Sequence, residues 1–223
     1  MAAEMTPRRL ATWAAIATAA LLVAGAATQL RPFWWDTRRP EHSVEVFGQH
    51  RALLMGGAWA RILLLFPMTA LGVAVAGLVD GDTMATRIGR AFAAAAGVLS
   101  AVSGVVAVVI GVAAEEAVPN RSVAVLADSV YWIQDNLLTM SLIAFAVALA
   151  AFSSPLWRAG ELPAWGRRAA QVSVLAAGAV PLSFYVGGAE HASVLYAVPA
   201  FGAQAAMVLW LLALVRGGLQ PGR

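Results

Sequence analysis

Apolar stretches alternate with short polar connections along the whole chain, and each stretch is long enough to cross a bilayer as a helix. An α-helix rises about 1.5 Å per residue, so about 20 apolar residues cover a hydrocarbon core about 30 Å thick. Six such stretches occupy residues 11–29, 52–79, 91–114, 128–152, 169–188 and 193–215. The pattern predicts an all-α fold, a polytopic transmembrane bundle of six helices that forms one domain over residues 1–223.

The first stretch allows two interpretations. It follows a short polar leader with Arg8 and Arg9, and it ends in the small residues 24–27, which also fit the cleavage site of a secretory signal peptide. The sequence leaves open whether this segment is cleaved or retained. The other spans pair up well if it is retained, so we expect six spans.

Composition supports a membrane location and excludes several chemistries. Hydrophobic residues make up 61% of the chain and charged residues only 12%, whereas a soluble domain carries about 25% charged residues. The chain has no cysteine, which excludes thiolate ligands and cysteine nucleophiles. Its 3 histidines lack metal-ligand spacing, so we expect no metal site and no cofactor. The basic residues form no stripe with aromatic interleaving, so we expect no nucleic-acid partner.

Arginines are distributed unequally between the two sides of the predicted bundle. Nine lie on the side of the two termini and five on the other, without Arg61, which lies inside the second span. Under the positive-inside rule the N- and C-termini are cytoplasmic. The alanine- and arginine-rich usage without lysine is typical of a GC-rich bacterial genome, so we expect a multi-pass protein of the cell membrane, the bacterial inner membrane.

The start of the fourth span is too polar to face lipid alone. Asp128, Tyr131, Trp132, Asp135 and Thr139 follow one another at helical spacing and therefore lie on one stripe. An ionisable residue at membrane depth normally faces the bundle interior, pairs with another group or lines a wet cavity. The stripe predicts a polar site inside the bundle, although aromatic residues at this position also fit an interfacial belt.

Arg61 in the second span is the candidate partner of Asp135. Either the true span begins near Ala60 and Arg61 marks the interface, or Arg61 is buried at a depth similar to that of Asp135. In the second case the two side chains can form an ion pair, which is either purely structural or part of a functional pocket; the third alternative is that they make no contact. Pro67 is expected to kink the same span.

We predict a polar pocket in the extracytoplasmic half of the bundle, to which the second, fourth and fifth spans contribute. Its candidate ligand-binding residues are Arg61, Tyr131, Trp132, Asp135, Tyr185, Glu190 and His191. For Glu190 and His191, which follow a Gly-Gly pair, we favour an ordinary solvated loop over a place in this pocket. Ser100 and Ser103 are interpreted as packing hydroxyls, and Gln204 as an interhelical hydrogen-bond donor.

The segments GELPAWGRRAA (residues 160–170) and VLWLLALVRG (residues 208–217), with a long loop before the second span, resemble a family of uncharacterised bacterial six-helix integral membrane proteins, known as a domain of unknown function. The resemblance implies the same six-helix topology. It implies no activity, because the family has none that can be transferred.

Three hypotheses for function follow from these features. The first is a bundle that binds a lipophilic or amphiphilic small molecule, or a membrane protein partner, through the predicted pocket. The second is a membrane-embedded enzyme with cyclase- or isomerase-like acid-base chemistry on a prenyl or other lipid, in which Asp135 or Glu190 acts as catalytic general acid or base. The third is a small proton-coupled transporter.

Overall fold

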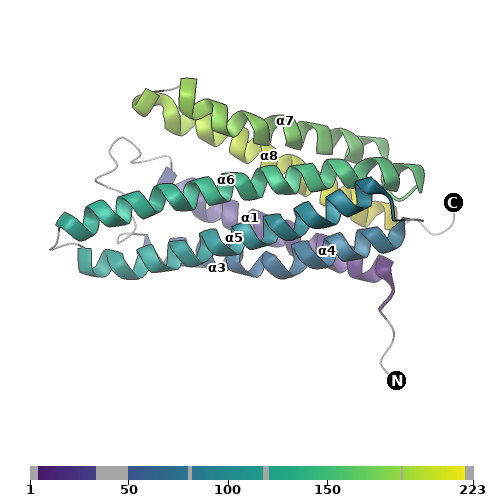
Figure 1. Ribbon diagram of the computed structural model, residues 1–223, viewed down its shortest axis with the longest axis horizontal. Helices are drawn as coiled ribbons and strands as arrows, with labels where there is room; N and C mark the ends of the chain where they lie inside the picture. The colour runs from purple at the N-terminus through teal and green to yellow at the C-terminus, as the bar shows by residue number, and fades with distance from the viewer. Residues whose placement is uncertain (1–4, 34–49, 80–81, 118–120, 187, 219–223) are drawn as a thin grey trace.

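The computed structural model describes residues 5–33, 50–79, 82–117, 121–186 and 188–218. Within these ranges the chain is helical and contains no strand, which confirms the predicted all-α class (Figure 1). The helices are α1 (Pro7–Phe33), α3 (Arg51–Leu63), α4 (Leu65–Leu78), α5 (Met84–Ala117), α6 (Arg121–Arg158), α7 (Ala164–Val186) and α8 (Gly188–Gly218).

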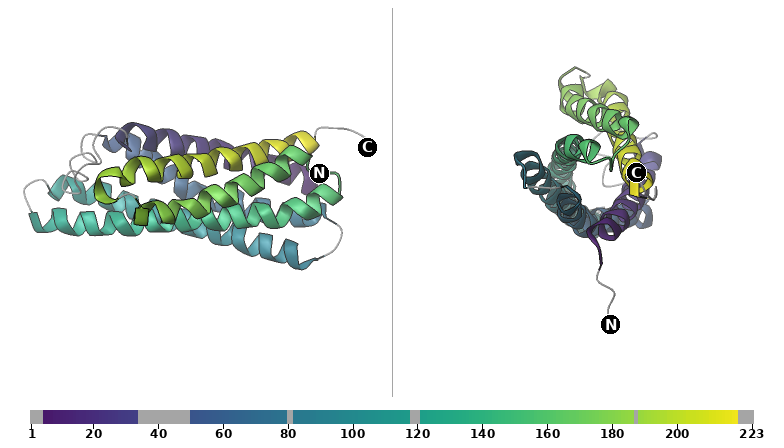
Figure 2. Two further views of the ribbon diagram at one scale, coloured as in Figure 1. Left: turned by 90° about the horizontal axis from the view of Figure 1, so that it is seen from above. Right: turned by 90° about the vertical axis from the view of Figure 1, so that its right-hand side faces the viewer.

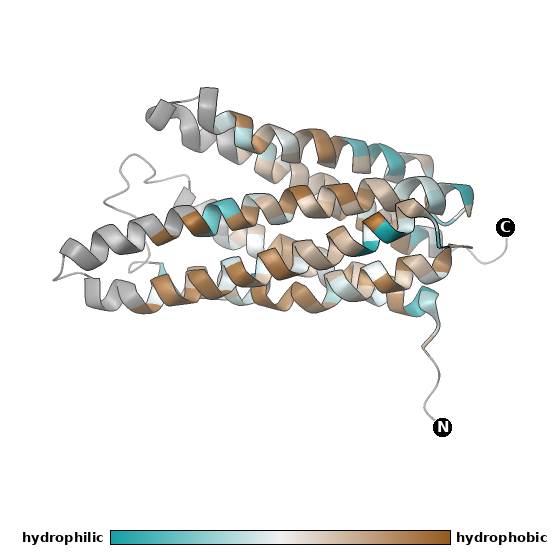
Figure 3. Ribbon diagram, in the orientation of Figure 1, coloured by the Kyte–Doolittle hydropathy of each residue, from teal (hydrophilic) through white to brown (hydrophobic). Residues whose placement is uncertain are grey.

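Most of the described helices are long and apolar enough to span a membrane, as Figure 3 shows by colour. Within the described residues there are five such spans, Pro7–Thr28, Arg51–Leu78, Met84–Val112, Ile133–Arg158 and Ala197–Gly217. The remaining predicted span, residues 169–188, coincides largely with α7, a helix of 23 residues. These lengths and compositions indicate a multi-pass membrane protein.

The helices follow one another around the bundle in chain order. α1 packs against α3 and α4, these pack against α5, and α5 packs against α6. α7 contacts α6 and α8, and α8 returns to α1 and closes the ring, which the end-on view in Figure 2 shows. Because α6 also touches α8 directly, α7 covers the seam between them from outside.

The second predicted span is divided into α3 and α4 at Leu64. Proline has no N–H to donate, so Pro67 cannot bond to the carbonyl four residues before it, and its ring crowds that turn. The N–H of Leu64 still donates to the Ala60 carbonyl at 3.1 Å, and the N–H of Met68 to the Leu64 carbonyl at 3.1 Å. The helix is interrupted at one residue, Leu64, three positions before Pro67, and the kink itself stays a prediction.

Small residues on α5 bring α3 and α4 unusually close to it. A Cβ atom added at Gly104 would lie 2.5 Å from the Ala58 carbonyl oxygen, and one at Gly97 would lie 3.1 Å from Cα of Leu65. Backbones can approach so closely only where the side chain is absent. At these two glycines α5 therefore packs directly against the backbones of α3 and α4.

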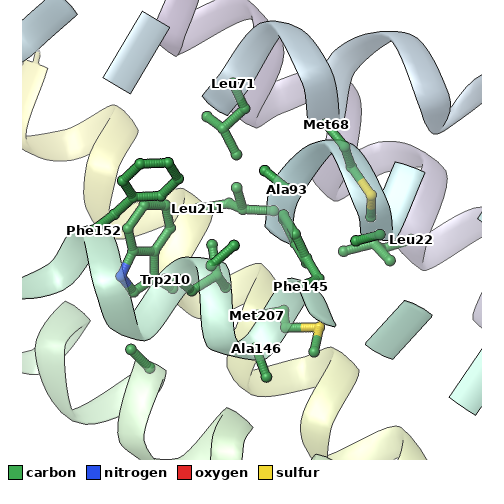
Figure 4. Close-up of a cluster of buried hydrophobic side chains, with 14 of the residues drawn as sticks. Leu22, Met68, Leu71, Ala93, Phe145, Ala146, Phe152, Met207, Trp210 and Leu211 are labelled. Carbon is green, nitrogen blue, oxygen red and sulfur yellow. The ribbon is translucent and has the colours of Figure 1, made fainter. Parts of the chain in front are cut away.

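The hydrophobic core is built from residues of α1, α4, α5, α6, α7 and α8 (Figure 4). Trp210 is fully buried there, and its Nε1 donates to Oγ of Ser153 at 2.8 Å. Ser153 in turn donates to the Leu149 carbonyl at 2.6 Å. An indole N–H buried in an apolar core needs such an acceptor, so this contact fixes α8 against α6.

Both termini lie at the end of the bundle that also carries the connections α4–α5 and α6–α7 (Figure 1). Arg8 pairs with Glu161 at 2.8 Å, which ties α1 to the α6–α7 connection. Asp82 binds both Arg87 and Arg90, at 2.9 and 2.8 Å. The side chains of Arg8, Arg87 and Arg90 at this end are exposed.

Candidate functional site

Arg61 is buried inside the bundle, with 6% of its surface exposed. The buried face of α3 consists of Arg61 and the small residues Gly57, Ala58 and Ala60. Because these neighbours have short side chains or none, α3 approaches α1 at Gly57 and α5 at Ala58 closely. The structure therefore agrees with the buried interpretation of Arg61 and not with the interfacial one.

Serine hydroxyls connect Arg61 to the next two helices. Its Nη1 donates to Oγ of Ser103 on α5 at 3.4 Å, and Ser103 donates to the Gln134 carbonyl on α6 at 3.2 Å. Ser100 donates from α5 to the Arg61 carbonyl at 3.1 Å, and Ser141 donates from α6 to the Ala96 carbonyl of α5 at 2.8 Å. These bonds join three helices through atoms that lipid could not solvate.

Asp135 follows Gln134 on α6 and is half-buried. It lies near enough to Arg61 for an electrostatic attraction between the two side chains. The predicted proximity of the two charges is therefore present. An arginine that is attracted by a carboxylate and bonded to a hydroxyl can exist at membrane depth, where an isolated charge is costly.

A small cavity lies beside Arg61 in the middle of the bundle, and we refer to it as the central cavity. Its volume is about 20 Å³, enough for one water molecule. Its polar lining residues are Arg61, Ser100, Ser141 and Gln204. Its other lining residues are Leu21, Leu22, Gly25, Ala26, Leu64, Met68, Leu138, Leu142 and Phe145. In Figure 4, Leu22, Met68 and Phe145 gather on the side of the core that borders this cavity.

Gln204 lies on α8 and is 8% exposed. Among the described residues, its Oε1 has no hydrogen-bond partner. We expected an interhelical hydrogen bond from this side chain, and instead it lines the cavity. A buried amide oxygen without a partner is rare in folded proteins, because its desolvation costs about 1–3 kcal/mol. Among the described residues, this oxygen is therefore an acceptor available beside the cavity.

The remaining predicted site residues are only partly described. The backbones of Tyr131, Trp132, Tyr185, Glu190 and His191 are helical, but their side chains lie outside the described residues. Glu190 and His191 belong to the first turn of α8, which begins at Gly188. The prediction of a loop there is wrong for the backbone, because helix α8 begins two residues before Glu190.

Sequence reasoning missed the role of three residues in this site. Ser100 and Ser103 bond to other helices and not only to their own turn, and Ser141 does the same. A signal was present, because Ser100 and Ser103 are three positions apart and so project from one face of the helix. Gln134, 3% exposed, was also overlooked, since it lies beside the more conspicuous Asp135.

Fold and site together define a multi-pass helical membrane protein with a buried polar network and a water-sized central cavity. No group of three or more residues that could hold a metal ion occurs among the described residues. Comparison with protein-family models, curated proteins and solved structures finds no match. The resemblance to a bacterial six-helix family thus stays a prediction.

Proposed function

We propose that the chain is an integral protein of the bacterial inner membrane, with cytoplasmic termini, that binds a lipophilic molecule with a small polar group in the central cavity. The observation that carries the proposal is the Gln204 side chain, which is buried, lines the cavity and leaves its Oε1 without a partner among the described residues. A ligand donor or a water that occupies the cavity would remove the desolvation cost.

The size of the cavity limits what it can hold. Pockets that enclose a whole drug-sized ligand measure about 300–1,000 Å³, whereas the central cavity measures about 20 Å³. Only the polar group of a lipid fits, so the tail has to lie between helices and extend into the bilayer. The apolar lining residues Leu22, Leu142 and Phe145 suit the first carbons of such a tail.

The geometry of the helix interruption favours binding over ion-coupled transport. Transporters bind their substrates and ions at half-helices whose backbone is unwound at the bilayer midplane. Leu64, at the interruption between α3 and α4, keeps right-handed helical angles of φ −59° and ψ −23°. The enzyme and transporter hypotheses stay predictions, and so does a membrane protein partner.

The proposal is tested by filling the cavity from Gly25. A Cβ atom at Gly25 would meet nothing within 4 Å, so a side chain added there enters free space beside the cavity. The matched control is Gly178 on α7, where an added Cβ also meets nothing within 4 Å but which does not line the cavity. Wild type, Gly25→Leu and Gly178→Leu are purified in parallel, and their bound lipids are extracted and compared by mass spectrometry.

We expect one lipophilic species to be enriched in wild type and in Gly178→Leu and to be lost from Gly25→Leu. Gly25→Ala, which adds only the Cβ that fits, should retain it and shows that position 25 tolerates substitution. Identical lipid profiles for all four proteins would refute a ligand in the central cavity.

A further inference from the structure

We infer that the polar group of the ligand is a hydroxyl, so that the ligand is a neutral lipophilic alcohol. The inference rests on the proposed function and names its ligand class. It follows from three properties of the central cavity, namely which hydrogen-bonding atoms face it, how its charge is balanced and how large it is.

The polar side chains that line the cavity offer several acceptors besides the donors of the Arg61 guanidinium and the Gln204 amide. A serine hydroxyl has a single hydrogen to donate. Ser100 gives its hydrogen to the Arg61 carbonyl, and Ser141 gives its hydrogen to the Ala96 carbonyl, since a carbonyl can only accept. Both hydroxyl oxygens therefore offer only lone pairs to the cavity, and Oε1 of Gln204 is a third acceptor, without a partner among the described residues. Three acceptors beside the donors of Arg61 and of the Gln204 amide suit a ligand group that both donates and accepts a hydrogen bond, as a hydroxyl does.

Arg61 does not turn the cavity into an anion site. Its guanidinium is attracted by the Asp135 carboxylate and donates to Ser103. The positive charge is thus balanced within the chain before any ligand enters. A carboxylate or phosphate ligand would compete with Asp135 and would direct its own lone pairs at the oxygens of Ser100, Ser141 and Gln204. Such contacts between acceptors are repulsive in a low-dielectric interior.

The volume of the cavity agrees with a single oxygen atom. A cavity needs roughly 10–15 Å³ to hold one water molecule, and the central cavity has about 20 Å³. A hydroxyl has the size of a water molecule, and its attached carbon can continue toward Gly25, where space is free. Carboxylate has two oxygens and phosphate four, so both exceed this volume unless helices move apart.

The test compares three probes with the same chain and different ends: dodecanol, dodecanoate and dodecyl methyl ether. Dodecanol donates and accepts, the ether only accepts, and dodecanoate is an anion at a pH above the titration range of its carboxyl group. Saturable binding of each radiolabelled probe is measured with the whole protein in nanodiscs, and binding to empty nanodiscs is subtracted. We expect wild-type protein to bind dodecanol about three- to tenfold more tightly than either other probe, the effect of one or two net hydrogen bonds.

Two glutamine variants provide a matched comparison. Gln204→Leu removes the acceptor without a partner and should reduce the preference for dodecanol over the ether to less than about twofold. Gln134→Leu removes a glutamine that is equally buried and whose Oε1 also has no partner among the described residues, but which does not line the cavity, so the preference should persist. If Gln204→Leu and Gln134→Leu lose the preference for dodecanol equally, Gln204 is not the acceptor of the ligand hydroxyl.

The probe series separates failure of this inference from failure of the proposed function. If dodecanoate or the ether binds as tightly as dodecanol, and Gly25→Leu abolishes that binding, the cavity binds lipid but the hydroxyl assignment is wrong. If none of the three probes binds saturably, the cavity holds water only and the proposed function is also wrong. The wild-type preferences alone decide between these results, even if Gln204→Leu does not fold.

Discussion

Gly104 allows the most direct test of how the polar site is held together, because α3 leaves no room for a side chain at this position. A Cβ atom there would lie 2.5 Å from the Ala58 carbonyl oxygen, 2.8 Å from Cγ1 of Ile62 and 3.0 Å from the Ile62 nitrogen. Two of these three atoms belong to the backbone and cannot rotate away. To restore an ordinary contact of 3.4 Å, α3 and α5 must separate locally by about 0.9 Å, the difference from 2.5 Å.

That separation acts on the hydrogen bonds of Arg61. Ser100 donates to the Arg61 carbonyl at 3.1 Å, and Arg61 donates to Ser103 at 3.4 Å, so both bonds would stretch beyond 3.5 Å. Each lost bond costs about 0.5–1.5 kcal/mol, and overpacking a close interface costs about 1–3 kcal/mol. Gly104→Ala should therefore lower the free energy of unfolding by about 2–6 kcal/mol.

The assay is reversible unfolding in mixed micelles, followed by circular dichroism. Gly178→Ala is the control, because its added Cβ meets nothing within 4 Å and alanine is favoured over glycine in a helix by up to about 1 kcal/mol. The control should be as stable as wild type or more stable. If Gly104→Ala unfolds together with wild type, the close approach of α3 and α5 is wrong, and so is the bonding pattern that depends on it.

Three further predictions use the same assay. Ser153→Ala removes the acceptor of the buried Trp210 N–H and should lower the free energy of unfolding by about 1–3 kcal/mol. An unchanged free energy of unfolding would mean that the indole finds another acceptor. Arg61→Leu and Asp135→Asn should each lower the free energy of unfolding by about 2–3 kcal/mol. This is less than the roughly 3–5 kcal/mol lost when a fully buried ion pair is broken, because Asp135 is only half-buried. The double variant should recover most of that loss if the pair is structural, whereas additive losses would show that the charges do not interact. Glu161→Gln removes the exposed ion pair with Arg8 and should lower the free energy of unfolding by less than about 1 kcal/mol. High salt should abolish this difference from wild type. A larger decrease that does not depend on salt would contradict the assignment of a weak surface ion pair.

The sequence was sufficient for the helical fold because membrane spans are encoded locally. Twenty consecutive apolar residues have few alternatives to a helix in lipid, so the six predicted stretches all coincide with helices. The interruption in the second span was also predictable, since the missing N–H of Pro67 is a local property. The extra helical turns, such as the start of α8 at Gly188, were not predicted, because polar residues can continue a helix beyond the hydrocarbon.

Only the charged residues of the site could be predicted from the sequence. Arg61 and Asp135 stand out in apolar spans, and the electrostatic attraction between them is present in the structure. The serines do not stand out, because a serine in a transmembrane helix usually bonds to its own preceding turn. Whether it instead reaches another helix depends on how closely two backbones approach, and that distance is a tertiary property that the sequence of one helix does not contain.

The distribution of free space around the central cavity indicates which helices would move to admit a ligand. On one side, α5 is fixed to α3 by the contact at Gly104 and by the bonds of Ser100 and Ser103, so this wall cannot widen without breaking them. On the side of α1, a Cβ at Gly25, which lines the cavity, would meet nothing within 4 Å. The wall formed by α1 therefore has room to yield, and α1 packs against α8, the helix that carries Gln204. A lipid tail that leaves the cavity between α1 and α8 would keep its polar group at the acceptors. The α3–α5 pair would stay rigid, so the tight packing on one side of the cavity would support ligand binding on the other.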